Sequence, residues 1–401
     1  MPLRFVRAQL DEIARDPALR LYGVAVAGLH ALTWLWLMTI GAARVFAPNE
    51  VHLCWPLVPC DELPLTPPLA HAVFGAYLAC ALASATLFLR RRIGAAWLLL
   101  CITTLLDLAI VLLDFRFRLN QHYMALFITL TFLFVPQRRR ALPLLITLFY
   151  FWAGALKLNW DWLSGNDLYV KPWLFSGRGL VAACAYVIVL ELVFTWGLLA
   201  RSPRVFWAAL AQFALFHVFS FHIVGWFYPV LMFFILSIHP LCRFLAMPEE
   251  SRAPLGAPVI ALAVFFSLLQ LVPHFLPGDR ALTGEGRLFA LHMFDARLSC
   301  EAHVEVLTDS GQRLSKPVRP LLAQRITCDP LVYLSYANKA CKTRGVRDLD
   351  LFLQSRHDDA QPFTKVLALH GVCSHPPSYN PLWHNPWILT GEIQDSGAPV
   401  R

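Results

Sequence analysis

Long apolar runs separated by short polar gaps fill the first two thirds of the chain. A run of about 20 apolar residues is what an α-helix needs to cross a bilayer. We expect spans over residues 21–47, 69–89, 94–115, 119–136, 141–158, 179–200, 205–224, 226–242 and 255–273. No internal repeat is evident, so the pattern predicts an all-α polytopic membrane bundle of about nine transmembrane helices.

The pattern changes after residue 273. The stretch AHVEVLTDSGQRL (302–314) alternates apolar and polar positions and then turns at Asp309-Ser310-Gly311, which is typical of a β-hairpin. The stretch DPLVYLSYANKAC (329–341) predicts a helix. We therefore expect three parts: an amphipathic cytoplasmic N-terminal segment (1–20), a transmembrane helical domain (21–273), and a small C-terminal α+β extramembrane domain on the outer side (274–401).

Composition supports a membrane protein and excludes a nucleic-acid partner. Hydrophobic residues make up 57% of the chain and charged residues only 15%, where soluble proteins have about 25% charged residues. The net charge is +8, but the basic residues form short clusters between apolar runs, which is a topology pattern. Membrane lipid is the expected partner. The first apolar run is too long for a cleavable signal peptide.

Lys and Arg mark the cytoplasmic loops of membrane proteins. With nine spans, five basic clusters share the side of the N-terminus, among them Arg90–Arg92 and Arg138–Arg140, while the opposite first loop (48–68) has acids but neither Lys nor Arg. Arg116, Lys171 and a few others fall on the far side. We expect a cytoplasmic N-terminus and an outer C-terminus.

Cysteine positions agree with this topology. Six cysteines fall in the predicted outer regions, where an oxidising environment permits disulfides. The candidates are Cys54, Cys60, Cys300, Cys328, Cys341 and Cys373. Their spacing leaves the pairing open and contains no paired Cys-x-x-Cys zinc signature, so no metal is expected. The other four lie in or beside spans and are expected to be packing residues.

Ionisable side chains inside spans are costly, and each raises a functional hypothesis. Lys157 ends the fifth predicted span and His122 begins the fourth, so antiparallel packing would let the two face each other at one depth. His222 lies near the same side. The alternative for Lys157 is that it only reaches the interface, and the Trp and Tyr residues around it would then form an interfacial belt.

Other polar residues in the spans favour structural interpretations. His71 and Asp114 are expected to anchor the interface, and His217 and His30 to be hydrogen-bonded core histidines. Asp107 and Glu191 lie deeper. They are expected to form hydrogen bonds inside the bundle, with a proton path as the alternative.

Lys157 lies in a motif, YFWAGALKLNWDWLSG (150–165), that resembles the signature of the vitamin K-dependent γ-carboxylase family and its bacterial relatives, the horizontally transferred transmembrane domain proteins. The resemblance continues in four further stretches: NQHY (120–123), PWLFSG (172–177), LFHVFSFHIVGWF (215–227) and GRLFALHMF (286–294). It implies a bacterial inner-membrane protein with a periplasmic C-terminus.

The resemblance also implies a chemistry. Lys157 matches the catalytic base, and His122 the histidine thought to assist it. The base deprotonates a reduced naphthoquinone (vitamin K or menaquinol-like), and its oxygenation to the epoxide drives proton abstraction from, and carboxylation of, a glutamyl peptide or protein. O2 and CO2 are co-substrates. The expected pocket residues for quinone and substrate are Asn120, Gln121, Tyr150, Trp152, Trp160, Asp161, Trp162, Trp173, His222 and Trp226.

For this chemistry the amine of Lys157 must be neutral, which burial favours. Because removing a desolvated lysine also removes a burial cost, we expect Lys157→Ala to leave stability near that of the wild type. The sequence departs from the vertebrate enzyme in having Leu156 where a second lysine is found. Two alternatives remain: a related redox or peptide-tailoring membrane enzyme without carboxylation, and a non-enzymatic lipid-binding membrane protein.

Overall fold

The computed structural model describes residues 2–42, 53–55, 66–168, 170–245, 254–291, 298–318, 326–357 and 361–391. The chain divides into two compact units. The first comprises Met1–His52, Asp61–Gly165 and Val170–Leu268, and the second comprises Leu53–Cys60, Asn166–Tyr169 and Leu269–Arg401.

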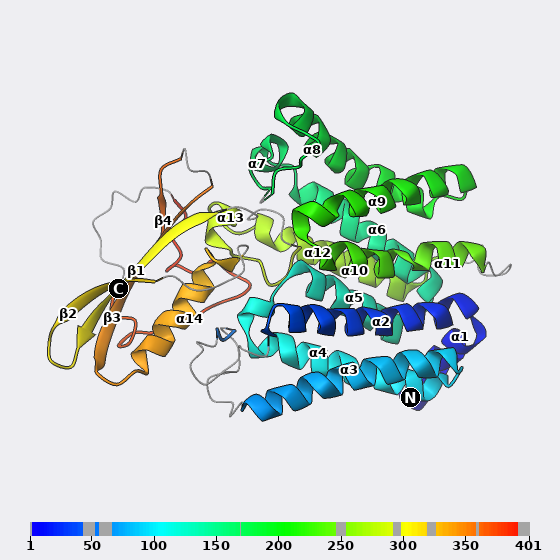
Figure 1. The fold of residues 1–401 in the computed structure, drawn as a ribbon, viewed down its shortest axis with the longest axis horizontal. Coiled ribbons are helices and arrows are strands. Elements are labelled where there is room, and N and C mark those ends of the chain that lie inside the picture. Colours follow the sequence, from blue (N-terminus) through cyan, green and yellow to red (C-terminus); the bar gives the residue numbers. More distant parts are fainter. Residues whose placement is uncertain are drawn as a thin grey trace. The chain divides into compact units, whose positions relative to one another are not determined.

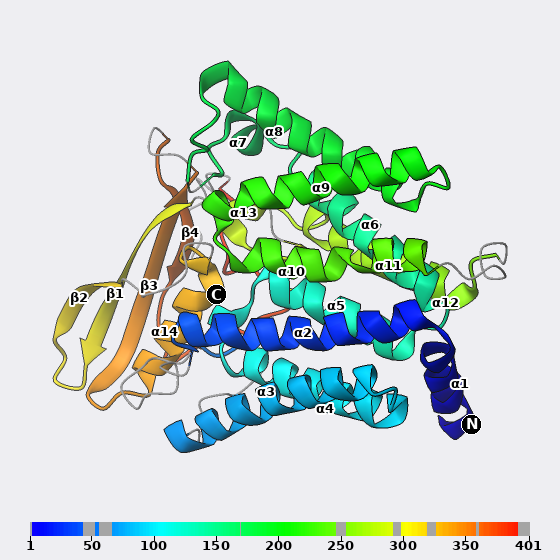
Figure 2. The ribbon, with the colours of Figure 1, turned by 45° about the vertical axis from the view of Figure 1, so that its right-hand side comes forward.

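The first unit is helical (Figure 1). Its helices are α1 (Pro2–Arg15), α2 (Pro17–Thr39), α3 (Pro67–Leu89), α4 (Ile93–Leu113), α5 (Asn120–Phe134), α6 (Arg138–Leu156), α7 (Trp160–Ser164), α8 (Gly177–Leu192), α9 (Pro203–Val224), α10 (Phe227–Leu236), α11 (Ile238–Phe244) and α12 (Ala257–Leu271). A 3-10 turn at Phe194–Leu199 extends α8. In Figures 1 and 2, α9, α10, α2 and α3 lie side by side in that order.

Seven helices of the described chain are long and apolar enough to cross a membrane. They are Pro17–Thr39, Pro67–Leu89, Ile93–Leu113, Gly177–Leu199, Pro203–Val224, Phe227–Phe244 and Ala257–His274. Multi-pass membrane character is therefore confirmed, whereas the count of nine is not.

The fourth and fifth predicted spans account for the difference between seven and nine. Both form helices, α5 and α6. The 15 residues of α5 reach only about 22 Å, against a hydrocarbon core of about 30 Å. The first turn of α6 carries three arginines, which lower its hydropathy. Both helices nevertheless bury much of their surface inside the bundle.

Ion pairs tie the end of α1 to the starts of α2 and α6. Arg138 is fully buried and bonds Glu12 through its side chain and its backbone N–H, both at 2.7 Å. Arg139 pairs with Asp16, which also caps α2 by accepting from Ala18 N at 2.8 Å. These two arginines therefore hold helices together, in addition to contributing to the charge of the loop.

The second unit is a small α+β domain, as expected. Its four antiparallel strands are β1 (Ser299–Thr308), β2 (Arg313–Val318), β3 (Val346–Arg356) and β4 (Thr364–Leu369), in the order β2-β1-β3-β4 (Figure 2). The hairpin turn after Thr308 and the helix α14 (Pro330–Cys341) fall where the sequence predicts them. A short helix, α13 (Arg280–Thr283), precedes the sheet. Asp329 caps α14 and pairs with the buried Arg287 at 2.9 Å.

Four of the six candidate cysteines form two pairs at disulfide distance. Cys300 pairs with Cys328, with their Cα atoms 5.6 Å apart, and Cys341 pairs with Cys373, at 5.3 Å. Cys54 is also disulfide-bonded, and Cys60 lies outside the described residues. The four cysteines in or beside the predicted spans, Cys80, Cys101, Cys184 and Cys242, are in no disulfide of the described chain, and Cys184 is buried.

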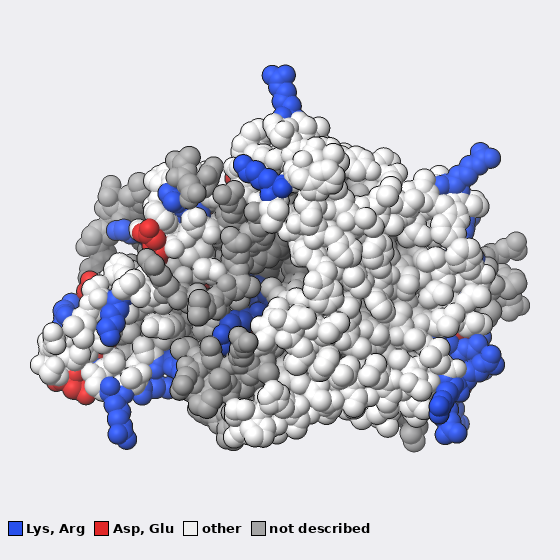
Figure 3. Space-filling model, in the orientation of Figure 1, with Lys and Arg blue, Asp and Glu red and all other residues white. Residues whose placement is uncertain are grey.

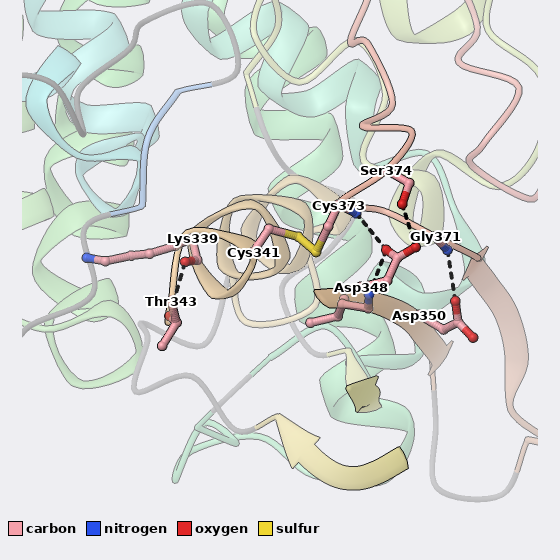
Figure 4. The surroundings of a disulfide bond; sticks show 9 residues. Lys339, Cys341, Thr343, Asp348, Asp350, Gly371, Cys373 and Ser374 are labelled. Carbon is pink, nitrogen blue, oxygen red and sulfur yellow. Dashed lines mark hydrogen bonds between the residues drawn. A yellow bond between two sulfur atoms is a disulfide. The ribbon is translucent and has the colours of Figure 1, made fainter. Parts of the chain in front are cut away.

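Asp348 organises the chain around the Cys341–Cys373 disulfide (Figure 4). Its carboxylate accepts from Ser374 Oγ at 2.7 Å and from the backbone N–H groups of Cys373 and Leu349. Burial by itself would raise the pKa of Asp348, but the bonds from Ser374 and the backbone outweigh it and hold that pKa below its ordinary value.

Asp348→Asn is expected to destabilise the second unit in a pH-dependent way. A carboxyl with a lowered folded-state pKa contributes stability above its unfolded pKa of about 3.9 and loses it as the pH falls through the folded value. The difference in thermal unfolding temperature between wild type and variant, followed by circular dichroism in detergent, should be largest above about pH 4 and shrink below it. A difference that is constant with pH would contradict this role. The exposed Asp309→Asn serves as a control.

Candidate active site

The motif around Lys157 folds as a helix end followed by a capped turn. Lys157 is the residue at which α6 ends. Asn159 then caps α7, accepting from Trp162 N at 2.7 Å and donating to Leu156 O at 3.2 Å. Gly165 ends α7 with a φ of 77°, and a Cβ there would meet Leu180 at 2.6 Å. The Asn-Trp-Asp-Trp stretch thus turns the chain back along α8.

Lys157 forms a buried pair with Glu191 of α8. Its Nζ lies 2.5 Å from Oε1 and 2.6 Å from Oε2 of Glu191. The two side chains are only 5% and 3% exposed. Lys157 therefore does not extend to an interface, and the interfacial alternative loses its support.

Two neighbours shape this pair. The Trp162 ring centroid lies 4.8 Å from Nζ, within range of a cation–π interaction, and its indole N–H donates to Cys184 O of α8. Gly154 lets α6 approach α8 at this level, because a Cβ on Gly154 would lie 2.8 Å from Glu191 Cβ. The glycine of the Ala-Gly-Ala-Leu-Lys stretch thus makes room for the carboxylate that Lys157 binds.

Tyr150 and His217 extend this polar cluster. The Tyr150 hydroxyl lies 2.7 Å from His217 Nε2, and both residues are buried. Tyr150 interacts electrostatically with Glu191, and His217 with Lys157. Tyr150, Gly154 and Lys157 are spaced i, i+4, i+7 along the chain, so they share one face of α6.

Glu191 lies inside a candidate membrane span. The span runs from Gly177 to Leu199, and Glu191 stands 14 residues after its start, which is about 21 Å along a helix. A lysine on a neighbouring helix that binds this carboxylate shares its depth. The pair therefore lies inside the candidate span 177–199, near the point where α8 gives way to the 3-10 turn that extends it.

His122 contacts other helices of the bundle than Lys157 does. Its ring is 5.6 Å from that of Trp36 on α2, and it interacts electrostatically with His30. Both of its ring nitrogens are buried without a hydrogen-bond partner among the described residues. It therefore makes no hydrogen bond to Lys157, and the expected facing of the two residues stays a prediction.

The remaining predicted pocket residues fall into separate groups. Trp173 contacts His222 edge-on at 6.2 Å, and Trp226 contacts Phe227, which stacks on Trp36. The indole of Trp152 donates to Ser267 of α12 at 3.1 Å. Asn120 is buried at the start of α5 beside the half-buried Gln121, Asp161 lies in the first turn of α7, and Trp160 and Trp173 are exposed.

The described residues also form a groove of about 560 Å³ that does not include Lys157 or Glu191. It is lined by apolar residues of α2, α3, α10 and α11, among them Gly28 and Phe234. None of the predicted pocket residues lines it.

Sequence reasoning did not include Glu191 or His217 among the site residues. Glu191 was expected to bond inside the bundle, which it does, but its partner is 34 residues away in sequence. The one available signal was an isolated acid within an apolar span, since such residues are rare without a function.

The pairing changes the expected stability of Lys157 variants. Removing one partner of a buried ion pair leaves an uncompensated charge, which costs about 3–5 kcal/mol, whereas replacing both can be neutral. Lys157→Met and Glu191→Leu should each lower the free energy of unfolding by about this much, and the double variant by less than the sum. Detergent-based unfolding of the four proteins measures the coupling.

The exposed pair Arg313–Glu305, whose side chains are 71% and 39% exposed, is the matched control. Its coupling should stay below about 1 kcal/mol. Additive effects at Lys157 and Glu191 would show that the two side chains do not interact.

No family model, no curated protein and no solved structure matches the chain. The resemblance to the γ-carboxylase family therefore rests on the quoted motifs, and the chemistry of the buried pair has to be argued from its own geometry.

Proposed function

We propose that the chain is an integral membrane enzyme of the vitamin K-dependent γ-carboxylase type, in which Lys157 is the base that deprotonates a reduced naphthoquinone. The observation that carries the proposal is the buried contact of Lys157 Nζ with both carboxylate oxygens of Glu191. It lies in the motif that resembles the family's base-bearing segment.

Glu191 supplies what a lysine base requires, a place for the ammonium proton. If the proton moves from Nζ to a carboxylate oxygen, the pair becomes an amine and a carboxylic acid, both neutral. Burial disfavours the charged forms of both groups, so the apolar surroundings favour this transfer. A neutral amine can then accept a proton from the substrate, and Glu191 holds the one displaced from Lys157.

The surroundings of the pair suit an aromatic diol. A quinol presents a flat ring and two hydroxyl groups. Next to the pair are the Trp162 ring, the Tyr150 hydroxyl and His217, whose Nδ1 is buried without a hydrogen-bond partner in the described part of the chain. These residues would hold the ring and one of its oxygens. The low water content of such a site protects a strong oxygen base.

The co-substrates follow from the resemblance. O2 would add to the deprotonated quinol, and the strong base so formed would remove a γ-proton from a glutamyl side chain of a peptide or protein. The quinone would leave as its epoxide, with the second oxygen atom released as water, and CO2 would add to the glutamyl carbanion. His122 keeps its proposed assisting role, supported by its two unpartnered ring nitrogens. No metal is part of the proposal.

One observation favours the non-enzymatic alternative. The apolar groove of about 560 Å³ between membrane-spanning helices is suited to a lipid chain. A related redox or peptide-tailoring enzyme that lacks carboxylation remains the second alternative. It is distinguished by quinol oxidation without incorporation of labelled CO2.

We also propose the orientation. Seven and nine spans are both odd, so either count places the ends of the helical unit on opposite sides of the membrane. Lys and Arg gather at the end of the helical unit where α1 lies, and the face between its ends is almost free of charge (Figure 3). By the positive-inside rule that end is cytoplasmic, and the C-terminus is periplasmic, in a bacterial inner membrane.

Lys157→Arg is expected to abolish quinol oxidation by purified protein in nanodiscs, because a guanidinium stays protonated and cannot act as a base. A general base contributes about 10²–10⁴-fold to rate, so a drop of that size is expected. Glu191→Gln should act in the same direction. The control is Lys171→Arg at an exposed position. Turnover retained in Lys157→Arg would refute the catalytic role.

Reporter fusions test the orientation. Alkaline phosphatase fused after Arg401 should be active, and a cytoplasmic fluorescent reporter at the same place dark. Fusions after Arg92, between α3 and α4, should show the opposite. An inactive phosphatase together with a bright reporter at Arg401 would reverse the proposed topology.

A further inference from the structure

A second buried polar cluster joins four helices of the bundle. It consists of His30 on α2, Tyr77 on α3, Asp107 on α4 and Thr129 on α5, which are 1%, 0%, 2% and 0% exposed. The first three residues lie in candidate membrane spans. The cluster shares no residue with the Lys157 site, and the inference below does not rest on the proposed function.

The four side chains form one continuous chain of hydrogen bonds. Asp107 Oδ1 lies 3.1 Å from the Tyr77 hydroxyl, which lies 2.9 Å from His30 Nδ1. His30 Nε2 lies 3.0 Å from Thr129 Oγ1. The direct separation of His30 Nδ1 and Asp107 Oδ2 is 3.9 Å, so the tyrosine bridges them.

The donors and acceptors at one end of the chain are determined. The Thr129 hydroxyl donates to the Ala125 carbonyl at 2.8 Å. Its oxygen must therefore accept from His30, so Nε2 of the imidazole carries a hydrogen. Only the protonation of Nδ1 remains open, and it depends on Tyr77 and Asp107.

Two arrangements of hydrogens then satisfy every member. In the first, Asp107 is a carboxylic acid that donates to Tyr77, and Tyr77 donates to the bare Nδ1 of a neutral His30. In the second, the His30 imidazolium donates to Tyr77, and Tyr77 donates to the Asp107 carboxylate. Both arrangements use the same heavy-atom positions and the same net charge.

We infer that Asp107, Tyr77 and His30 form an intramembrane proton-transfer chain. In the transfer, the carboxyl proton of Asp107 moves to the Tyr77 oxygen while the Tyr77 proton moves to His30 Nδ1. One O–H bond breaks and one forms at Tyr77, which remains a neutral phenol. Asp107 becomes a carboxylate and His30 an imidazolium, and the reverse movement restores the first arrangement.

The residues beside this hydrogen-bonded cluster indicate which group could exchange a proton with it. Thr33 of α2 already donates to the Leu29 carbonyl, and it does not ionise. The ionisable neighbour is His122 on α5, which interacts electrostatically with His30 and has two unpartnered ring nitrogens. A proton held at His30 is therefore close enough to His122 for the two imidazoles to interact electrostatically. A purely structural cluster needs no ionisable groups, and an intramembrane aspartate is costly unless it is used.

Infrared spectroscopy of the full-length protein in detergent tests the inference. Asp107→Asn should remove a protonated-carboxyl C=O band. His30→Gln keeps one donor and one acceptor but cannot take up a proton, so the same band should grow, by about twofold if the two arrangements are equally populated in the wild type. Equal band areas in wild type and His30→Gln, or no band sensitive to Asp107→Asn, would overturn the inference.

Nitrogen-15 NMR of labelled histidines provides a readout that does not depend on the glutamine variant folding. The wild type should show an imidazolium component for His30, and Asp107→Asn should leave only the neutral Nε2–H form. An unchanged His30 signal in Asp107→Asn would equally overturn the inference. Lys171→Arg is the control, because this residue is exposed and belongs to neither buried cluster, and it should alter neither spectrum.

Discussion

A lysine and a glutamate buried together among membrane-spanning helices impose the main constraint on this structure. Each charge alone would be costly in an apolar bundle, so the two must meet with good geometry. Glu191 reaches Lys157 because Gly154 leaves room for it, and Lys157 is available because α6 ends there. Asn159 and Gly165 then turn the chain so that Trp162 covers the ammonium. The motif around Lys157 is the local sequence that this contact requires.

The interior of the bundle contains two separate buried polar clusters. The Lys157–Glu191 cluster contains a buried amine and a carboxylate in contact, and Tyr150 and His217 extend it. The His30–Tyr77–Asp107 cluster can hold one proton in two places. His122 belongs with the second cluster by its contacts. The described part of the bundle therefore contains two separate buried groups of ionisable side chains, with Lys157 in the first and His122 beside the second.

The sequence predicted features that depend on local pattern. The spans, the hairpin at Asp309–Gly311, α14 and the candidate cysteines of the second unit follow from periodicity, turn residues and compartment. Pairings between distant residues could not be predicted: Lys157 with Glu191, Cys300 with Cys328, and Arg138 with Glu12. The count of nine spans was not confirmed because hydropathy does not distinguish a full span from short helices such as α5 that are enclosed by others.

Photo-crosslinking with a naphthoquinone analogue tests most directly whether the Lys157–Glu191 pair is a quinol site. A photoactivatable menaquinone in nanodiscs should label peptides containing residues 150–165 or 184–192, and an excess of unlabelled menaquinol should suppress the labelling. Exposed control peptides of the second unit should stay unlabelled. Labelling confined to the groove of α2, α3, α10 and α11, or labelling near Lys157 that menaquinol does not displace, would contradict the proposed site.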